Sequence, residues 1–234
     1  MKFCFSILTL MFFCGVYAQD EVVEKKPVVD SLYREDQFYF NVSFNNIQNA
    51  PSGLKQNKIS SSLAFGFLRD MPINKRRTFS IAAGLGYTKN ILNENLYTYD
   101  TSNSNNSILA YEIISSDIYY SKNRLTTHYI DLPIEIRWRN STFESHKFWR
   151  IYTGFKLSYL IADNYKFAND LNTTTIKNDP NLNKFQYGCY IASGWNSLNV
   201  YFYYGLNPIF KSTELNGQSN KMNNFNLGFQ FYIL

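Results

Sequence analysis

The chain has 234 residues, the length of a single domain, and 45% of them are hydrophobic while 18% are charged. This balance argues against an intrinsically disordered tail and against a helical membrane protein. The formal net charge of +5 comes from basic residues spread along the chain, which gives no case for nucleic-acid binding, although a basic loop would favour anionic lipid headgroups.

Residues 1–18 are expected to be an export signal that is cleaved. Lys2 supplies a positive start, the run up to Val16 is almost wholly apolar, and Ala18 is a small residue just before the cut. The run is shorter than the ~20 apolar residues of a spanning helix, which disfavours an uncleaved anchor. Residues 19–36 are mixed in charge and lack periodicity, so we expect a periplasmic arm there.

From residue 37 onward the hydrophobicity alternates with a period of two, which is typical of strands and not of helices. In the first stretch Phe38 and Phe40 fall on one face, and Tyr39 and Asn41 fall on the other. The connections alternate between long polar segments and short turns, the asymmetry of outer-membrane barrels. The predicted strands are 37–44, 62–67, 79–88, 129–138, 150–161, 185–192, 199–206 and 224–233. The long connections are 45–60, 90–126, 163–183 and 211–221.

Volume decides which face of the strands points outward. The apolar faces carry about 35 bulky side chains, whereas a ring of about eight strands leaves an interior only just wide enough for ordinary side chains. The opposite faces are rich in Gly, Ala, Ser and Asn, with some Tyr, and this set fits a narrow interior. The sequence therefore predicts an all-β fold: an eight-stranded antiparallel transmembrane β-barrel over residues 37–234, with long extracellular loops and short periplasmic turns.

The face predicted to point inward carries charges on the fourth and fifth strands. We expect opposite charges to pair across these neighbours, because an unpaired buried charge costs several kcal/mol. The favoured interpretation is a structural polar plug that does not conduct, and the alternative is a path for protons or substrate. Pro133 on the same strand predicts a bulge or a missing ladder bond. The predicted lumen charges are Asp131, Glu135, Arg137, Arg150 and Lys156.

Five aromatic residues fall near the predicted strand ends, where an outer-membrane barrel carries its aromatic girdles at the two lipid–water boundaries. These candidates are Tyr87, Trp138, Trp149, Tyr159 and Tyr204.

The sequence offers little for catalysis or cofactor binding. No His/Cys/Asp cluster has metal-ligand spacing and no Gly-rich phosphate loop follows a strand, so we expect no catalytic, metal or cofactor residues. His146 lies in a polar turn. His128 begins the fourth strand, where it would need a nearby serine and carboxylate to act as a lipid-modifying enzyme at the barrel mouth. The candidates in the preceding loop are Ser115, Ser116, Asp117 and Ser121.

The segment from Tyr129 to Arg137 (YIDLPIEIR) resembles the PorT family of outer-membrane β-barrel proteins from Bacteroidetes, whose members carry an aromatic, an acidic residue and Leu/Ile-Pro before a basic residue. The segments from Tyr152 to Lys156 and from Tyr204 to Pro208 look like later strands of that family. The founding member is implicated in type IX secretion and gliding motility, so the resemblance implies an envelope or secretion-accessory role. It supplies no catalytic residues.

We therefore expect a non-enzymatic outer-membrane protein with a structural or interaction role. Its expected partners are outer-membrane lipid and, through the extracellular loops and above all residues 90–126, envelope or secretion-machinery proteins. A narrow pore or small-solute transporter is the alternative, and a lipid-modifying enzyme is less favoured.

Overall fold

The computed structural model describes residues 36–101, 109–115, 117–140, 149–211, 214–215, 218–219 and 221–233. All regular secondary structure in these segments is β-strand. No helix in this part of the chain has the length and apolar character needed to cross a membrane. The expected export signal, His146, and the expected periplasmic arm apart from Asp36 lie outside the described residues.

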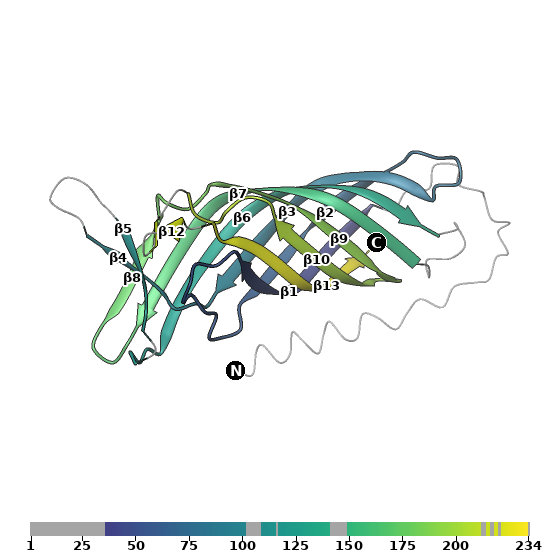
Figure 1. Ribbon diagram of the computed structural model, residues 1–234. Coiled ribbons are helices and arrows are strands. Elements are labelled where there is room, and N and C mark those ends of the chain that lie inside the picture. Colours follow the sequence, from purple (N-terminus) through teal and green to yellow (C-terminus); the bar gives the residue numbers. More distant parts are fainter. Residues whose placement is uncertain are drawn as a thin grey trace, which may run out of the picture. The chain divides into compact units, whose positions relative to one another are not determined.

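Eight long antiparallel strands close into a ring, which confirms the predicted barrel (Figure 1). They pair in the order β1-β2-β3-β6-β7-β9-β10-β13, and β13 returns to β1, where Ile233 lies opposite Phe38. A closed ring has no edge with unpaired backbone groups, as a strand assembly in hydrocarbon requires. The ring strands are β1 (Gln37–Gln48), β2 (Ser61–Pro72), β3 (Phe79–Leu92), β6 (Lys122–Arg139), β7 (Trp149–Ala168), β9 (Phe185–Trp195), β10 (Leu198–Gly205) and β13 (Asn223–Ile233).

The two faces of the ring strands differ as the alternation predicts. Along β1, Phe38, Phe40 and Phe44 are exposed on the outside, while Tyr39 and Asn41 are buried inside. The other ring strands repeat this alternation of exposed apolar and buried side chains. Such an extensive apolar surface around a closed barrel suits hydrocarbon and not water. The prediction that the bulky face points outward is confirmed.

Pro133 lies on the inward face of β6, where a bulge or a missing bond was expected. The register between β3 and β6 omits Gly84 and Leu85, the two residues of β3 that come opposite Pro133 and Leu132. On its other side Pro133 stays paired with Lys156 of β7. Proline has no backbone N–H to donate, and the ladder is interrupted only toward β3. The expectation of a locally missing bond is confirmed.

β6 and β7 are longer than the alternation predicted, because both strands continue beyond a β-bulge. The register between them shifts next to His128, and Ile161 is the extra residue on β7. One extra residue exchanges the two faces of a strand, so Asp163 is buried on the inner side beyond the bulge. β7 then continues and pairs with β8 (Thr173–Lys177). The long polar connection predicted over residues 163–183 therefore contains regular structure, since β7 extends to Ala168 and β8 follows it.

The long connection expected over residues 90–126 also contains regular structure. β3 and β6 both extend into it, and between them β4 (Leu96–Asp100) and β5 (Leu109–Ile113) form a hairpin. Tyr97 of β4 packs edge-on against Phe167 of β7, with ring centroids 4.7 Å apart. The connection is long, as predicted, but it contains strands and an apolar side chain that packs against β7, which its polar composition did not indicate.

The long connections gather at one end of the barrel, where the interior changes from polar to apolar. A β-bridge joins Leu182, before β9, to Phe210, after β10, and the connection after β10 also contains the short pair β11 (Glu214–Leu215) and β12 (Gln218–Ser219). By the asymmetry of outer-membrane barrels this end is extracellular. We call its apolar cluster the cap. The buried residues of the cap are Ile47, Leu92, Leu96, Ile114, Leu125, Tyr129, Leu160, Tyr165, Phe167, Leu182, Ile209, Phe210 and Met222.

Candidate functional site

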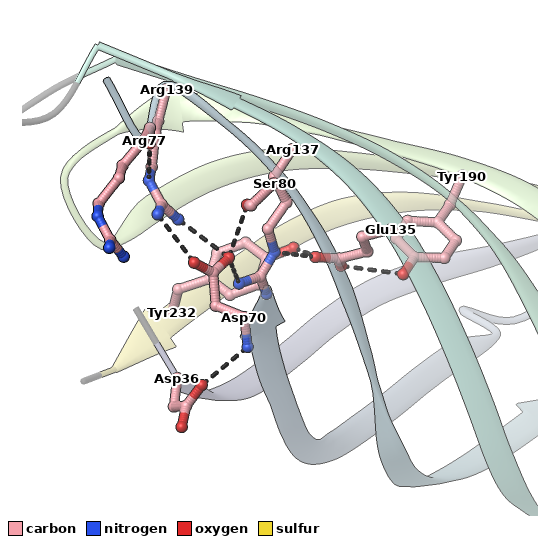
Figure 2. Close-up of polar contacts among 9 residues, drawn as sticks. All are labelled: Asp36, Asp70, Arg77, Ser80, Glu135, Arg137, Arg139, Tyr190 and Tyr232. Atoms are coloured by element: carbon pink, nitrogen blue, oxygen red, sulfur yellow. Dashed lines mark hydrogen bonds and ion pairs between the residues drawn. The ribbon is translucent and has the colours of Figure 1, made fainter. Parts of the chain in front are cut away.

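Asp70, on the inward face of β2, holds two arginines of β6 inside the barrel (Figure 2). Its Oδ1 atom accepts hydrogen bonds from Nη1 of Arg137 at 3.1 Å and from Nη1 of Arg139 at 3.0 Å, and its Oδ2 atom accepts from Nη2 of Arg139 at 2.8 Å. Ser80 donates to the same carboxylate at 2.7 Å. All three charged side chains are fully buried. Several charge-assisted hydrogen bonds offset the desolvation that their burial costs.

Glu135 extends this network across the lumen. Nε of Arg137 donates to Oε2 of Glu135 at 2.7 Å, and the hydroxyls of Tyr190 and Tyr232 each donate to Oε1 at 2.9 Å. The guanidinium carbon of Arg137 also lies 4.8 Å from the ring centroid of Tyr152. We call Asp70, Glu135, Arg137 and Arg139 the arginine cluster. With its tyrosine partners it links β2, β6, β7, β9 and β13, so it braces the barrel from within.

Asp131 forms a second charged group nearer the cap. Nζ of Lys156, on the neighbouring strand β7, lies 3.8 Å from Oδ2 of Asp131. Ser158 donates to Oδ1 at 2.5 Å, and Thr88 donates to Oδ2. The Lys156 ammonium also lies 4.6 Å from the ring centroid of Tyr203. This pair spans β6 and β7, the two strands on which the sequence predicted opposite charges to meet.

Arg150 is the remaining charged residue that the sequence placed in the lumen. It is buried near the end of the barrel with the short turns, and its guanidinium carbon lies 5.7 Å from the ring centroid of Tyr152 and 5.8 Å from that of Tyr232. The structure thus places all five predicted lumen charges inside the barrel. Four of them divide between two groups, Glu135 with Arg137 in the arginine cluster and Asp131 with Lys156, while the guanidinium of Arg150 lies beside the rings of Tyr152 and Tyr232.

Two members of the arginine cluster, Asp70 and Arg139, were not predicted from the sequence. Both continue an alternation that was recognised: Asp70 follows Ala64 and Leu68 on the inward face of β2, and Arg139 follows Arg137 on β6. The predicted strands ended too early to include them. Extending the period of two to the short turns would have found both residues.

Tyrosines fill most of the space that the charged groups leave. Tyr39 lies over Gly66 and Gly86, where an added Cβ atom would come within 2.7 Å and 1.9 Å of its side chain. In the same way Tyr190 occupies the space above Gly154. The cavity that remains beside Tyr39 and Glu135 has a volume of about 10 Å³, room for about one water molecule. The inward tyrosines are Tyr39, Tyr129, Tyr152, Tyr190, Tyr201, Tyr203 and Tyr232.

The five candidates for the aromatic girdles lie on the outward faces of their strands. Trp138 and Trp149 lie next to the short turn between β6 and β7, and Trp149 packs edge-on against Trp195 with ring centroids 5.8 Å apart. All three tryptophans of the chain therefore lie at the periplasmic end. Toward the other end, Tyr159 packs on Phe185. Tyr204 is exposed on β10, and Tyr87 is half-buried on β3. Their role at the lipid–water boundaries stays a prediction.

The geometry does not bring His128 to a described serine. His128 lies on the outward side of β6, where its Nδ1 atom forms a hydrogen bond with the hydroxyl of Tyr87. Ser121 donates instead to the carbonyl of Ala168 at 3.2 Å. A hydrogen bond from Ser115 lowers the pKa of the exposed Asp117 carboxyl.

Ser116 and His146 lie outside the described residues, and in the described part of the chain no group of His, Cys, Asp and Glu could hold a metal ion.

The extracellular end carries a groove between two connections. Loop residues 49–60 are tied to residues 113–121 by the amide of Asn57, which donates to the hydroxyl of Tyr120 at 3.1 Å, and by the ammonium of Lys58, which donates to the carbonyl of Ser121 at 2.7 Å. The cavity volume is about 780 Å³. Two of the residues that line it carry exposed apolar side chains: Tyr119 is 74% exposed and Ile118 is 51% exposed. Apolar side chains this exposed in water favour an interaction surface. The groove is lined by Gly53, Lys55, Asn57, Lys58, Asn95, Ile113, Ile114, Ser115, Asp117, Ile118, Tyr119 and Tyr120.

A comparison with models of protein families matches residues 17–211 to the family described as outer membrane protein beta-barrel domain. The match includes the ring strands from β1 to β10. A search of curated proteins found no match.

Proposed function

The chain belongs to the outer membrane protein β-barrel domain family, and from this premise we propose that it acts without catalysis, as a closed barrel that anchors an interaction surface in the outer membrane. The observation that carries the proposal is the filled lumen. The arginine cluster, the Asp131–Lys156 pair and the inward tyrosines leave a cavity of about 10 Å³ beside Glu135. A hydrated ion or a solute needs a wider path than a cavity that holds one water molecule. We therefore expect the protein to act through its outer surfaces and not through its lumen.

The extracellular groove supports the interaction part of the proposal. It combines lysine and asparagine side chains with the exposed Tyr119 and Ile118 on a surface held by hydrogen bonds to neighbouring loops. The resemblance to the PorT family favours a partner from the envelope or the secretion machinery, in a role accessory to type IX secretion or gliding. We also propose that residues 1–18 are the signal that is removed during export.

Electrical recording in planar bilayers tests the closed lumen. We expect no sizeable conductance from the purified chain, because the side chains around Glu135 leave room for only about one water molecule there. The double variant Tyr39→Ala/Tyr201→Ala enlarges the cavity, since both side chains line it, and should raise the conductance. The control Tyr159→Ala/Tyr204→Ala removes two outward tyrosines and should not. Large stable channels from the unmodified chain would contradict the proposal in favour of a pore, and a change of ion selectivity on neutralising Arg137 or Lys156 would place the path in the lumen.

Photo-crosslinking in native outer membranes tests the interaction surface. A crosslinker at Tyr119, beside the groove, is expected to capture a defined envelope protein, whereas one at Ile73 in a periplasmic turn serves as the control. Both positions are exposed, so access alone does not distinguish them. Equal capture at both positions, or none at Tyr119, would contradict an extracellular partner at this groove.

A further inference from the structure

Beyond the bulge, the outward faces of β3, β6, β7 and β8 are basic. The alternation that places Tyr87 and Ile161 toward lipid continues with cations, and the described residues of these outward faces include no carboxylate. The remaining side chains on them are mainly Thr, Asn and Ala. We call this surface the basic face. Its members are Lys89, Lys122, Arg124, Lys166 and Lys177.

The cations of the basic face are close neighbours in the sheet. Arg124 lies directly opposite Lys166 in the register of β6 and β7. Lys122 and Lys177 are diagonal neighbours of Lys166, since Lys122 pairs with Ala168 and Lys177 pairs with Asn164. Diagonal neighbours on a sheet lie about 7–8 Å apart, and like charges directly opposite each other destabilise the pair. The fold by itself gains nothing from this arrangement.

No described side chain neutralises the four lysines. They form neither an ion pair nor a hydrogen bond through their ammonium groups with the rest of the described chain. Arg124 uses its Nε atom to donate to the side-chain oxygen of Asn93 at 3.0 Å, which leaves its charge uncompensated. A cluster of unpaired cations on one face calls for an anion from outside the chain.

The height of the basic face relative to the apolar band identifies the source of that anion. Lys89 lies two residues beyond Tyr87 on the same face of β3, and Lys166 lies five residues beyond Ile161 on β7. With a rise of about 3.3 Å per residue and a strand tilt of about 40°, Lys89 and Lys177 lie roughly 5 to 8 Å beyond the lipid-facing apolar surface, Arg124 and Lys166 about 13 Å, and Lys122 about 18 Å. The headgroup layer is about 5 to 8 Å deep on each side of the hydrocarbon core. Lys89 and Lys177 therefore lie at headgroup depth, the stems of Arg124 and Lys166 can reach back toward it, and Lys122 lies within about a Debye length of it.

We propose that the basic face binds the phosphate groups of anionic headgroups in the outer leaflet, with the acyl chains of the same lipids packed on the apolar surface below it. Lysine ammonium groups bind phosphate as point charges, and several neighbouring ones suit a headgroup with net negative charge. This inference rests on the extracellular position of the long loops in the proposed function, and it is independent of whether the lumen conducts.

Native mass spectrometry of the detergent-solubilised chain tests the proposal. The unmodified protein should bind dimyristoyl-phosphatidylglycerol at least about tenfold more tightly than dimyristoyl-phosphatidylcholine, which has the same acyl chains. The variant Lys122→Gln/Lys166→Gln/Lys177→Gln should lose this preference, since each basic residue near a membrane surface is worth about fivefold in affinity. Replacing the same three lysines by arginine keeps the charge and should keep the preference.

A matched control separates the basic face from net charge. The variant Lys55→Gln/Lys211→Gln/Lys221→Gln removes three exposed lysines from the same end of the barrel and should leave the preference within about twofold. Equal losses in the two triple variants, or no preference in the unmodified chain, would overturn the proposal. So would binding of soluble polyphosphate that depends on the three lysines while phosphatidylglycerol does not bind. Conductance of the same variants in planar bilayers tests the closed lumen separately, so a failure of lipid binding and a failure of the closed lumen can be told apart.

Discussion

Charged and tyrosine side chains dominate the interior of the barrel, whereas Leu, Ile and Phe dominate that of the cap, although the same strands run through both. In the barrel, β6 points Asp131, Glu135 and Arg137 inward, and beyond the bulge the same strand points Leu125 inward. The difference follows from what surrounds each region. Hydrocarbon accepts the apolar side chains of the barrel on the outside and leaves the interior for polar groups. The cap extends into water, where an apolar core is the stable arrangement.

The largest effect is expected from removing Asp70, the carboxylate that contacts both arginines of the arginine cluster. Asp70→Ala leaves Arg137 and Arg139 buried without the carboxylate that both contact. The free energy of unfolding should fall by about 3–5 kcal/mol, the cost of breaking a buried ion pair from one side. Urea unfolding in lipid vesicles, followed by tryptophan fluorescence, measures it. Asp170→Ala, in an exposed turn, is the control, and an equal effect of both variants would show that the barrel does not depend on its polar interior.

The sequence predicted the barrel because alternation depends only on the neighbouring residues of one strand. The ring of eight strands, the outward Phe38 and Phe40, and the inward Glu135 and Arg137 all follow from it. The interruption at Pro133 also follows, since a missing N–H is a property of the residue itself.

Alternation along one strand does not predict contacts between different strands. β2 and β6 lie on either side of β3, and the position of Asp70 beside Arg137 and Arg139 depends on the registers of both strands against β3. One sequence does not contain those registers. The cap was missed for a different reason. The bulge at Ile161 changes the phase of the alternation, so a single period of two ends there although the strand continues. A polar composition then made residues 163–183 resemble a loop.

A cavity in the cap tests whether it has a core of its own. Leu182→Ala shortens a fully buried side chain of the cap and leaves the backbone bridge to Phe210 in place. The free energy of cap opening should fall by about 3 kcal/mol, while the barrel keeps its stability. Hydrogen exchange with mass spectrometry reports the two regions separately. Leu171→Ala, at an 88% exposed position, should change neither, and destabilisation of cap and barrel together would show that they form one cooperative unit.

A buried carboxyl makes the cap sensitive to pH. Burial raises the pKa of Glu94 to about 7, and its Oε2 atom has no hydrogen-bond partner among the described residues. In an opened cap the carboxyl is solvated and loses its proton near the ordinary glutamate pKa of 4.5. The closed cap therefore holds more protons than the open one between these values, and its stability falls as the pH rises through them.

The expected loss from about pH 5 to about pH 7 is about 2 kcal/mol of cap-opening free energy. Hydrogen exchange of β4 and β5, corrected for the intrinsic rate at each pH, measures it. Glu94→Gln should remove most of the dependence, and the remainder is expected from Asp163, whose carboxyl pKa burial also raises. Glu112→Gln, at an exposed position on β5, should retain the full dependence. A full pH dependence that survives Glu94→Gln would assign the titration to another group.

The smallest effect concerns how tightly the barrel interior is packed. An alanine at Gly86 would place its Cβ atom 1.9 Å from the hydroxyl oxygen of Tyr39 and 3.0 Å from the ring carbon that bears it. The ring must move, and we expect a cost of about 1–2 kcal/mol in urea unfolding. Tyr39→Phe removes the nearest atom, so the alanine should cost about 1 kcal/mol less in that background.

This double-mutant cycle tests whether the interior of the barrel is packed as tightly as that of the cap. Gly205→Ala is the control, because its added Cβ would meet no atom closer than 3.3 Å, and it should be nearly neutral. If Gly86→Ala is as mild as Gly205→Ala, the tyrosine has room to move and the interior is packed more loosely than its buried polar groups imply. If the cost is real but Tyr39→Phe does not reduce it, the backbone of β2 next to Gly86 sets the limit. Only relief by Tyr39→Phe would show that tyrosine and glycine are matched in size, which is how a narrow polar interior reaches the packing that the cap obtains from Leu and Phe.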